Sequence, residues 1–186
     1  MLYALMVAVA ALLNSTLDGE LSSLWAPLPH TSSAELSVTL GVSTGLVVVF
    51  LGRITERYSA RTRSITQAFA DMLKGTTAQA VFPIALMSSL AEELFFRGFL
   101  QPRFGLVITA VIFGVVHVAF DRRLMPWWQL AAIVMGLMFG WLMELTGTIL
   151  APFLAHFTIN FFNLHHILGP TTSSAQMGHT AKEWKR

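Results

Sequence analysis

Six apolar stretches alternate with short polar segments along the chain, at residues 1–17, 36–52, 77–101, 104–120, 127–145 and 148–168. A helix that crosses a bilayer needs about 20 apolar residues, with a range of roughly 17–25. Because lipid offers the backbone no hydrogen-bond partners, such stretches are expected to be helical. The pattern predicts an all-α fold, a polytopic transmembrane bundle of about six spanning helices. The first stretch is barely long enough for a spanning helix, since its uninterrupted apolar run ends at Leu13.

The composition agrees with a membrane protein of one domain. The chain has 186 residues, of which 54% are hydrophobic and 12% charged, whereas soluble domains average about 25% charged residues. We expect residues 1–168 to form a single transmembrane helical domain with a motif-bearing core at 77–168, followed by a polar C-terminal tail at 169–186. The chain has no cysteine, which excludes a disulfide framework, a thiolate zinc site and a cysteine nucleophile.

Charge is distributed unevenly between the segments that join the apolar stretches. The segment 18–35 holds three acidic residues and no Lys or Arg, while the segment 53–74 holds five basic residues. Six spans with both termini in the cytoplasm would place ten of the 12 basic residues on the cytoplasmic side, as the positive-inside rule requires. These residues lie in loops and are not interleaved with aromatics, so we expect the lipid bilayer and no nucleic acid as a partner.

Two pairs of glycines lie one helical turn apart inside apolar stretches, Gly41 with Gly45 and Gly136 with Gly140. Small residues at this spacing let helix backbones approach closely. We expect these faces to pack within the bundle.

The first candidate cluster for chemistry is Glu92, Glu93 and Arg97, in one of the most apolar parts of the chain. Burying each charge in hydrocarbon costs about 3 kcal/mol on insertion scales, so retained charges indicate a functional site. Glu93 and Arg97 are four residues apart and can pair on one helix face. Glu92 lies about 100° away on a helical wheel and is free to act elsewhere. The alternative is that the three charges only stabilise one another.

The second cluster is His117, which follows Phe113 by four residues in the fourth apolar stretch. A single histidine on an apolar helix can equally be a hydrogen-bonded core residue, so His117 alone does not decide between structure and function.

The third cluster is His156 and Asn160, which point the same way from one helix because they are four residues apart. Two polar groups on one face of a membrane helix need a common partner. They could serve a reaction or join two helices. Asn163 lies on the same general face and is expected in a supporting position.

Together the clusters supply two carboxylates, two imidazoles and an amide from three helices, which suits hydrolysis by an activated water. A carboxylate would take the proton from water, and imidazole and amide groups would donate to the oxyanion. Alternatively Glu92, His117 and His156 could hold a divalent metal such as zinc and leave one position open for water. The sequence leaves both versions open. It contains no His-Glu-x-x-His motif, no aspartate inside an apolar stretch and no Gly-x-Ser-x-Gly elbow.

The ordered motifs Glu-Glu-x-x-x-Arg at 92–97, Phe-x-x-x-His at 113–117 and His-x-x-x-Asn at 156–160 resemble the CPBP family, which includes the type II CAAX prenyl endopeptidases and the bacterial Abi proteins. The resemblance implies an intramembrane endopeptidase, glutamic or metal-dependent, in a bacterial plasma membrane, whose substrate is a membrane-anchored protein or peptide. It also implies that Glu92 is the base, that His117 assists it, and that His156 and Asn160 hold the oxyanion.

Two other functions use the same residues, and one geometric problem remains. The polar groups could belong to a non-catalytic scaffold or bacteriocin-immunity factor, or to a proton-coupled transporter, although no inverted repeat is visible. In a strict up-and-down bundle Glu92 lies nearer the outer end of its helix, and His117 nearer the inner end of the next. We therefore expect the third helix to run from about Phe82 to Gln101, which would place Glu92 at mid-depth. Substrate identity and oligomeric state are not readable from the sequence.

Overall fold

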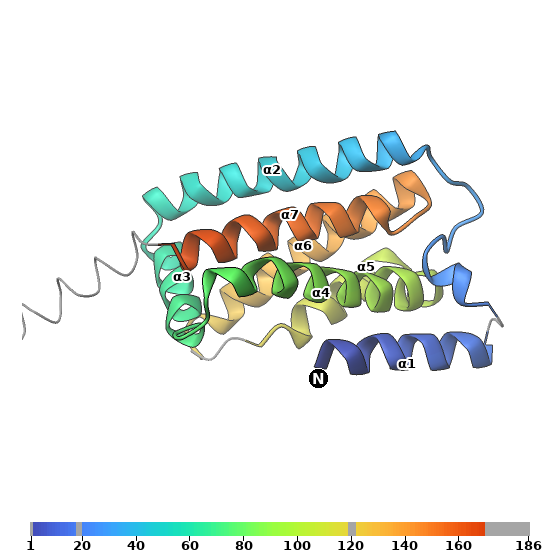
Figure 1. Cartoon of the computed structure of the whole chain (residues 1–186), viewed down its shortest axis with the longest axis horizontal. Coiled ribbons are helices and arrows are strands. Elements are labelled where there is room, and N and C mark those ends of the chain that lie inside the picture. The colour runs from blue at the N-terminus through green and yellow to red at the C-terminus, as the bar shows by residue number, and fades with distance from the viewer. Residues whose placement is uncertain (1, 18–19, 119–121, 170–186) are drawn as a thin grey trace, which may run out of the picture.

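A computed structural model describes residues 2–17, 20–118 and 122–169, and this part of the chain is helical without a strand (Figure 1). The predicted all-α bundle is confirmed. The polar tail predicted at 169–186 lies outside the described residues beyond Gly169, as does the end of the fourth apolar stretch at 119–120. The elements are α1 (Leu2–Leu17), η1 (Leu21–Leu24), α2 (Ala34–Tyr58), α3 (Ala60–Met72), η2 (Ala78–Ala80), α4 (Val81–Glu93), η3 (Leu94–Leu100), α5 (Gln101–Val116), α6 (Met125–Thr146) and α7 (Leu150–Ile167).

Within the described residues, three helical stretches are long and apolar enough to cross a membrane: Ala34–Tyr58, Ala78–Val116 and Met125–Thr146. A shorter apolar helix covers Tyr3–Leu17. The protein is therefore an integral membrane protein. Six passes with both termini in the cytoplasm stay a prediction.

The middle stretch folds back on itself at Gly105. This residue has φ 76° and ψ 166°, a backbone conformation that favours glycine because it has no Cβ. One straight helix from residue 92 to residue 117 would separate its ends by roughly 37 Å at 1.5 Å per residue, yet the Glu92 and His117 side chains are in contact. The chain thus runs out along α4 and η3 and returns along α5 (Figure 1).

The position of this turn explains how Glu92 and His117 can meet, which a strict up-and-down bundle would not allow. The helical backbone continues past Gln101, where we expected it to end, and turns only at Gly105. Glu92 precedes the turn by 13 residues and His117 follows it by 12. The two arms of the hairpin therefore bring both side chains to the same depth.

The predicted glycine faces pack inside the bundle. A Cβ on Gly41 would lie 2.5 Å from the Ala151 carbonyl oxygen, and one on Gly45 would lie 2.7 Å from Thr158 Cβ. These contacts let α2 lie along α7 (Figure 1). Gly136 likewise meets Ala110 of α5, since a Cβ on this glycine would lie 3.0 Å from the Ala110 Cα. Helix α7, which carries the third motif, is fixed between α2 and α4 by this close approach.

Helix α3 lies across one end of the bundle, in a segment that the sequence indicated only as a basic loop (Figure 1). Its Arg61 guanidinium lies 3.8 Å from the centre of the Trp127 ring, and Phe69 contacts the Trp128 ring at 4.7 Å. Arg53, near the C-terminal end of α2, lies toward this same end of the bundle. At the other end of the bundle Arg103 donates to Asn14 Oδ1 at 3.1 Å.

Candidate active site

The buried ion pair predicted from the first motif is present. Arg97 Nε lies 3.2 Å from Glu93 Oε2, and Arg97 Nη1 donates to Glu93 Oε1 at 3.3 Å. Both side chains are 0% exposed. Arg97 Nη2 also donates to the Gly136 carbonyl of α6 at 3.0 Å, and the Phe113 ring lies 4.6 Å from the guanidinium. The pair thus connects η3 to two other helices.

The π-helical backbone of η3 starts directly after this glutamate pair. Single π-turns inside α-helices are rare and occur often at functional sites, because the wider turn changes which side chains share a face.

Glu93 also binds His156 from α7. The Nδ1 atom of His156 lies 2.7 Å from Glu93 Oε1, and its ring stacks on Phe139 at 4.8 Å and 16°. An ionised carboxylate only accepts hydrogen bonds, so Nδ1 is the donor. This contact fixes the tautomer of neutral His156 and turns Nε2 toward Glu92, at 3.9 Å from Oε2.

His117 ends α5 instead of lying within a helix as the sequence indicated. It is the C-cap residue, with φ −79° and ψ 80°. The last four carbonyls of α5 each accept a hydrogen bond: Phe113 from His117 Nδ1, Gly114 from the His117 N–H, Val115 from Gln129 Nε2 and Val116 from the Val118 N–H. A helix can end at this depth because none of its final carbonyls is left without a partner.

Glu92 lies between the two imidazoles. Its Oε2 atom is 3.5 Å from His117 Nε2 and 3.9 Å from His156 Nε2. The atom is buried and accepts no hydrogen bond from the described side chains. The Nδ1 atom of His117 contacts the Phe113 carbonyl, and that of His156 contacts Glu93. The two Nε2 atoms are therefore left facing the same carboxylate oxygen of Glu92.

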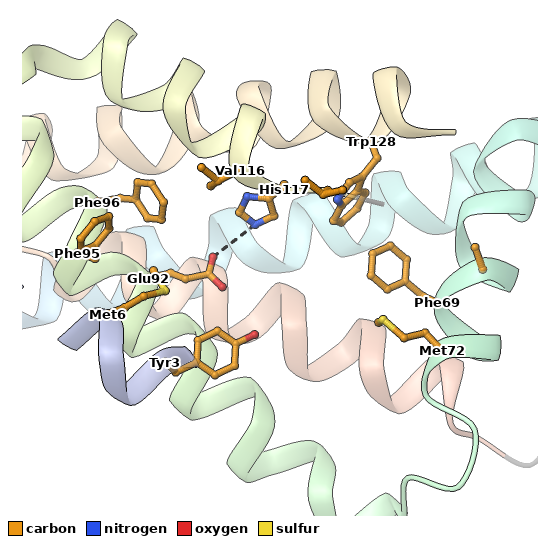
Figure 2. A pocket seen from close by; sticks show the side chains of 12 residues that line it. Tyr3, Met6, Phe69, Met72, Glu92, Phe95, Phe96, Val116, His117 and Trp128 are labelled. Carbon is orange, nitrogen blue, oxygen red and sulfur yellow. Dashed lines mark ion pairs between the residues drawn. The ribbon is translucent and has the colours of Figure 1, made fainter. Parts of the chain in front are cut away.

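This region forms part of the wall of a cavity of about 600 Å³ (Figure 2). The cavity is lined by side chains of α1, α3, α4, η3, the end of α5 and the start of α6, and most of them are apolar. Glu92, His117 and Tyr3 contribute polar groups. Such a cavity has room for an apolar or amphipathic ligand beside the carboxylate.

Asn160 lies one helical turn after His156 on α7. Its Nδ2 atom donates to Ser88 Oγ at 3.2 Å and lies 3.5 Å from Ser89 Oγ. The expectation that Asn163 supports the site is not met, because Asn163 Oδ1 accepts instead from Arg53 Nη2 of α2, at 3.2 Å. Asn163 lies three positions after Asn160 along α7, and its side chain faces α2.

The metal alternative stays a prediction. Among residues 2–17, 20–118 and 122–169, no group of three or more His, Cys, Asp or Glu side chains is arranged to hold a metal ion. Glu92, His117 and His156 converge, but their geometry does not amount to such a group.

Several residues of the site were not predicted from the sequence. Tyr3, Ser88 and Phe139 are of ordinary types for apolar helices, and the Gly136 contribution is a backbone carbonyl. Only the polarity of Ser88 and Ser89, one turn before the glutamate pair, could have indicated a partner for the amide of Asn160.

Comparisons with known proteins agree with the motifs. Residues 74–162 match the family model described as type II CAAX prenyl endopeptidase Rce1-like. The chain is 34% identical over 79 residues to the uncharacterized protein YpbD of Bacillus subtilis, and the match covers 41% of this chain and 40% of YpbD. It thus spans about two fifths of that relative's length. No solved structure gives a significant match.

Proposed function

We propose, from the match of residues 74–162 to the Rce1-like model of type II CAAX prenyl endopeptidases, that the protein is an intramembrane endopeptidase. Its substrate would be a membrane-anchored protein or peptide, in which it hydrolyses a peptide bond. The observation that carries the proposal is the buried Glu92 carboxylate, which lies with His117 on the wall of a largely apolar cavity. The Nε2 atom of His156 lies 3.9 Å from the same carboxylate oxygen.

In this proposal Glu92 is the general base. A water held between Glu92 Oε2 and His117 Nε2 would donate one hydrogen to each, because neutral His117 donates through Nδ1 to the Phe113 carbonyl and keeps Nε2 as an acceptor. The water oxygen would then attack the scissile carbonyl carbon while its proton passes to Glu92. The same proton would later reach the leaving amine, as general acid–base catalysis requires.

The oxyanion would form on the side of α7. To donate to it, His156 would carry protons on both nitrogens, and the Glu93 carboxylate at Nδ1 would balance the imidazolium charge. Glu92, Glu93 and Arg97 together carry one net negative charge when all three are ionised. A protonated His156 would bring the four side chains to neutrality, which reduces the cost of burying them in lipid. Asn160 would add its amide after leaving Ser88. Each lost oxyanion donor would cost roughly 10²–10³ in rate.

The test compares membranes that contain the wild-type protein with membranes that contain Glu92→Gln. New protein termini are identified by mass spectrometry as a function of time. We expect a set of termini that depends on the wild-type protein and disappears in the variant, since loss of a general base costs about 10²–10⁴ in rate. Equal amounts of the same termini in both membranes would refute the proposal.

The same experiment addresses a non-catalytic scaffold or immunity factor. The network of Glu93, Arg97 and His156 connects several helices, as a scaffold would need. A Glu92→Gln protein that produces no termini but still complements the phenotype of a deletion strain would favour that function.

A further inference from the structure

Helix α1 contributes to the cavity although it lies outside the segment that matches the family. Two of its side chains, Tyr3 and Met6, line the cavity together with Glu92 and His117. Figure 2 shows Tyr3 across the cavity from His117, with its hydroxyl directed into the space between them. The helix packs along α4 and η3, so Tyr3 is held beside the helix that carries Glu92.

The hydroxyl of Tyr3 has neighbours that belong to the site. It interacts with the side chain of Ser88 and with the charge of Glu92. Ser88 Oγ is also the atom that accepts from Asn160 Nδ2, at 3.2 Å. Tyr3, Ser88 and Asn160 thus form a chain of contacts between three different helices, and of the three only Tyr3 lines the cavity.

The chemistry of the cavity leaves a need that Tyr3 can meet. A peptide bond that enters a largely apolar cavity must find a hydrogen-bond donor for its carbonyl oxygen, because an unpaired buried carbonyl costs about 1–3 kcal/mol. Glu92 only accepts hydrogen bonds when ionised, and neutral His117 uses its proton on the Phe113 carbonyl. The donors proposed above, His156 and Asn160, are not among the side chains that line the cavity, and the Asn160 amide is turned toward Ser88 and Ser89. The phenolic O–H of Tyr3 is a donor that already faces the cavity.

We propose that Tyr3 binds the substrate directly, donating its hydroxyl hydrogen to the carbonyl oxygen of the peptide bond that the Glu92-activated water attacks. This proposal rests on the proposed function. It makes α1 part of the active site and assigns a role to a residue that none of the three sequence motifs contains. The contact would strengthen as negative charge develops on the carbonyl oxygen.

The test is Tyr3→Phe in the full chain, because this change removes the O–H and keeps the ring. In the membrane assay that follows new protein termini, we expect the Glu92-dependent termini to appear at least tenfold more slowly than with the wild-type protein, in line with loss of one donor to the reacting oxygen. The matched control is Tyr58→Phe, which makes the same chemical change at the other tyrosine of the chain, a residue that is 78% exposed and does not line the cavity. It should stay within about twofold of the wild-type rate, since surface substitutions away from the site have small effects.

Amounts of folded protein are equalised by size-exclusion chromatography, so that a folding defect is not read as a lost contact. A Tyr3→Phe rate within twofold of wild type, with Glu92→Gln inactive, would overturn this inference and leave the proposed function intact. An equal loss in Tyr58→Phe would also overturn it, because the effect would then not depend on a hydroxyl in the cavity. Full activity of Glu92→Gln would instead refute the proposed function itself.

Discussion

Replacing Glu93 by glutamine should destabilise the folded protein far more than the same replacement at Glu92. The change keeps the shape of the side chain and an oxygen that can accept from His156. It removes the negative charge that faces Arg97, which is 0% exposed. The guanidinium would keep its hydrogen bond to the Gly136 carbonyl but would have lost its paired counter-charge.

The size of the effect follows from the contact distance. Two unit charges 3.2 Å apart attract by roughly 5 kcal/mol at an effective dielectric constant of about 20. Removing one partner of a buried pair costs about 3–5 kcal/mol in measured cases, because an uncompensated charge remains. We therefore expect Glu93→Gln to lower the free energy of unfolding by about 3 kcal/mol or more.

The measurement is reversible unfolding in mixed micelles with increasing SDS, followed by tryptophan fluorescence. Glu92→Gln is the matched control, because Glu92 Oε2 accepts no hydrogen bond and its charge lies next to a second carboxylate. It should unfold close to wild type. The double variant Glu93→Gln with Arg97→Met should recover part of the loss, since it also removes the guanidinium that would otherwise lack its counter-charge. Equal unfolding midpoints for Glu93→Gln and the wild type would refute the reasoning, as would equal losses at Glu92 and Glu93.

Two further predictions concern helix packing and metal. Gly45→Val should destabilise the protein by about 1–3 kcal/mol, since even a Cβ at this position would lie 2.7 Å from Thr158 Cβ. The control is Gly52→Ala, because a Cβ at position 52 would have no neighbouring atom within 4 Å. Equal unfolding midpoints of the two variants in SDS would contradict this prediction. Treatment of the membranes with EDTA should leave the rate of Glu92-dependent cleavage unchanged, because the proposed mechanism activates water with Glu92 and His117; a loss that added zinc restores would contradict this and favour the metal alternative.

Local spacing was enough to predict contacts that lie within one helix. The pairing of Glu93 with Arg97 follows from residues four apart, and the glycine faces of α2 and α6 follow from the same period. Both depend on helical geometry alone, which the apolar pattern already indicated.

Contacts between helices were predicted less well, because a face does not identify its partner. His156 and Asn160 share a face as expected, yet one binds Glu93 and the other Ser88. The position of the α4–α5 turn depends on a single glycine with positive φ, and an apolar stretch contains no periodic signal for it. Tyr3 reaches the cavity through a packing of distant segments that no local pattern encodes.

The way α5 ends has a consequence for genetic dissection of this protein. His117 supplies two of the four hydrogen bonds that close the end of that helix, one from its ring and one from its backbone. An alanine at this position would remove the imidazole that we propose holds the attacking water, and it would also take the ring hydrogen bond from the Phe113 carbonyl. Loss of turnover in such a variant would therefore be ambiguous between chemistry and misassembly. Glu92, whose Oε2 atom accepts no hydrogen bond from the described side chains, is the position where we expect an inactive yet correctly assembled protein.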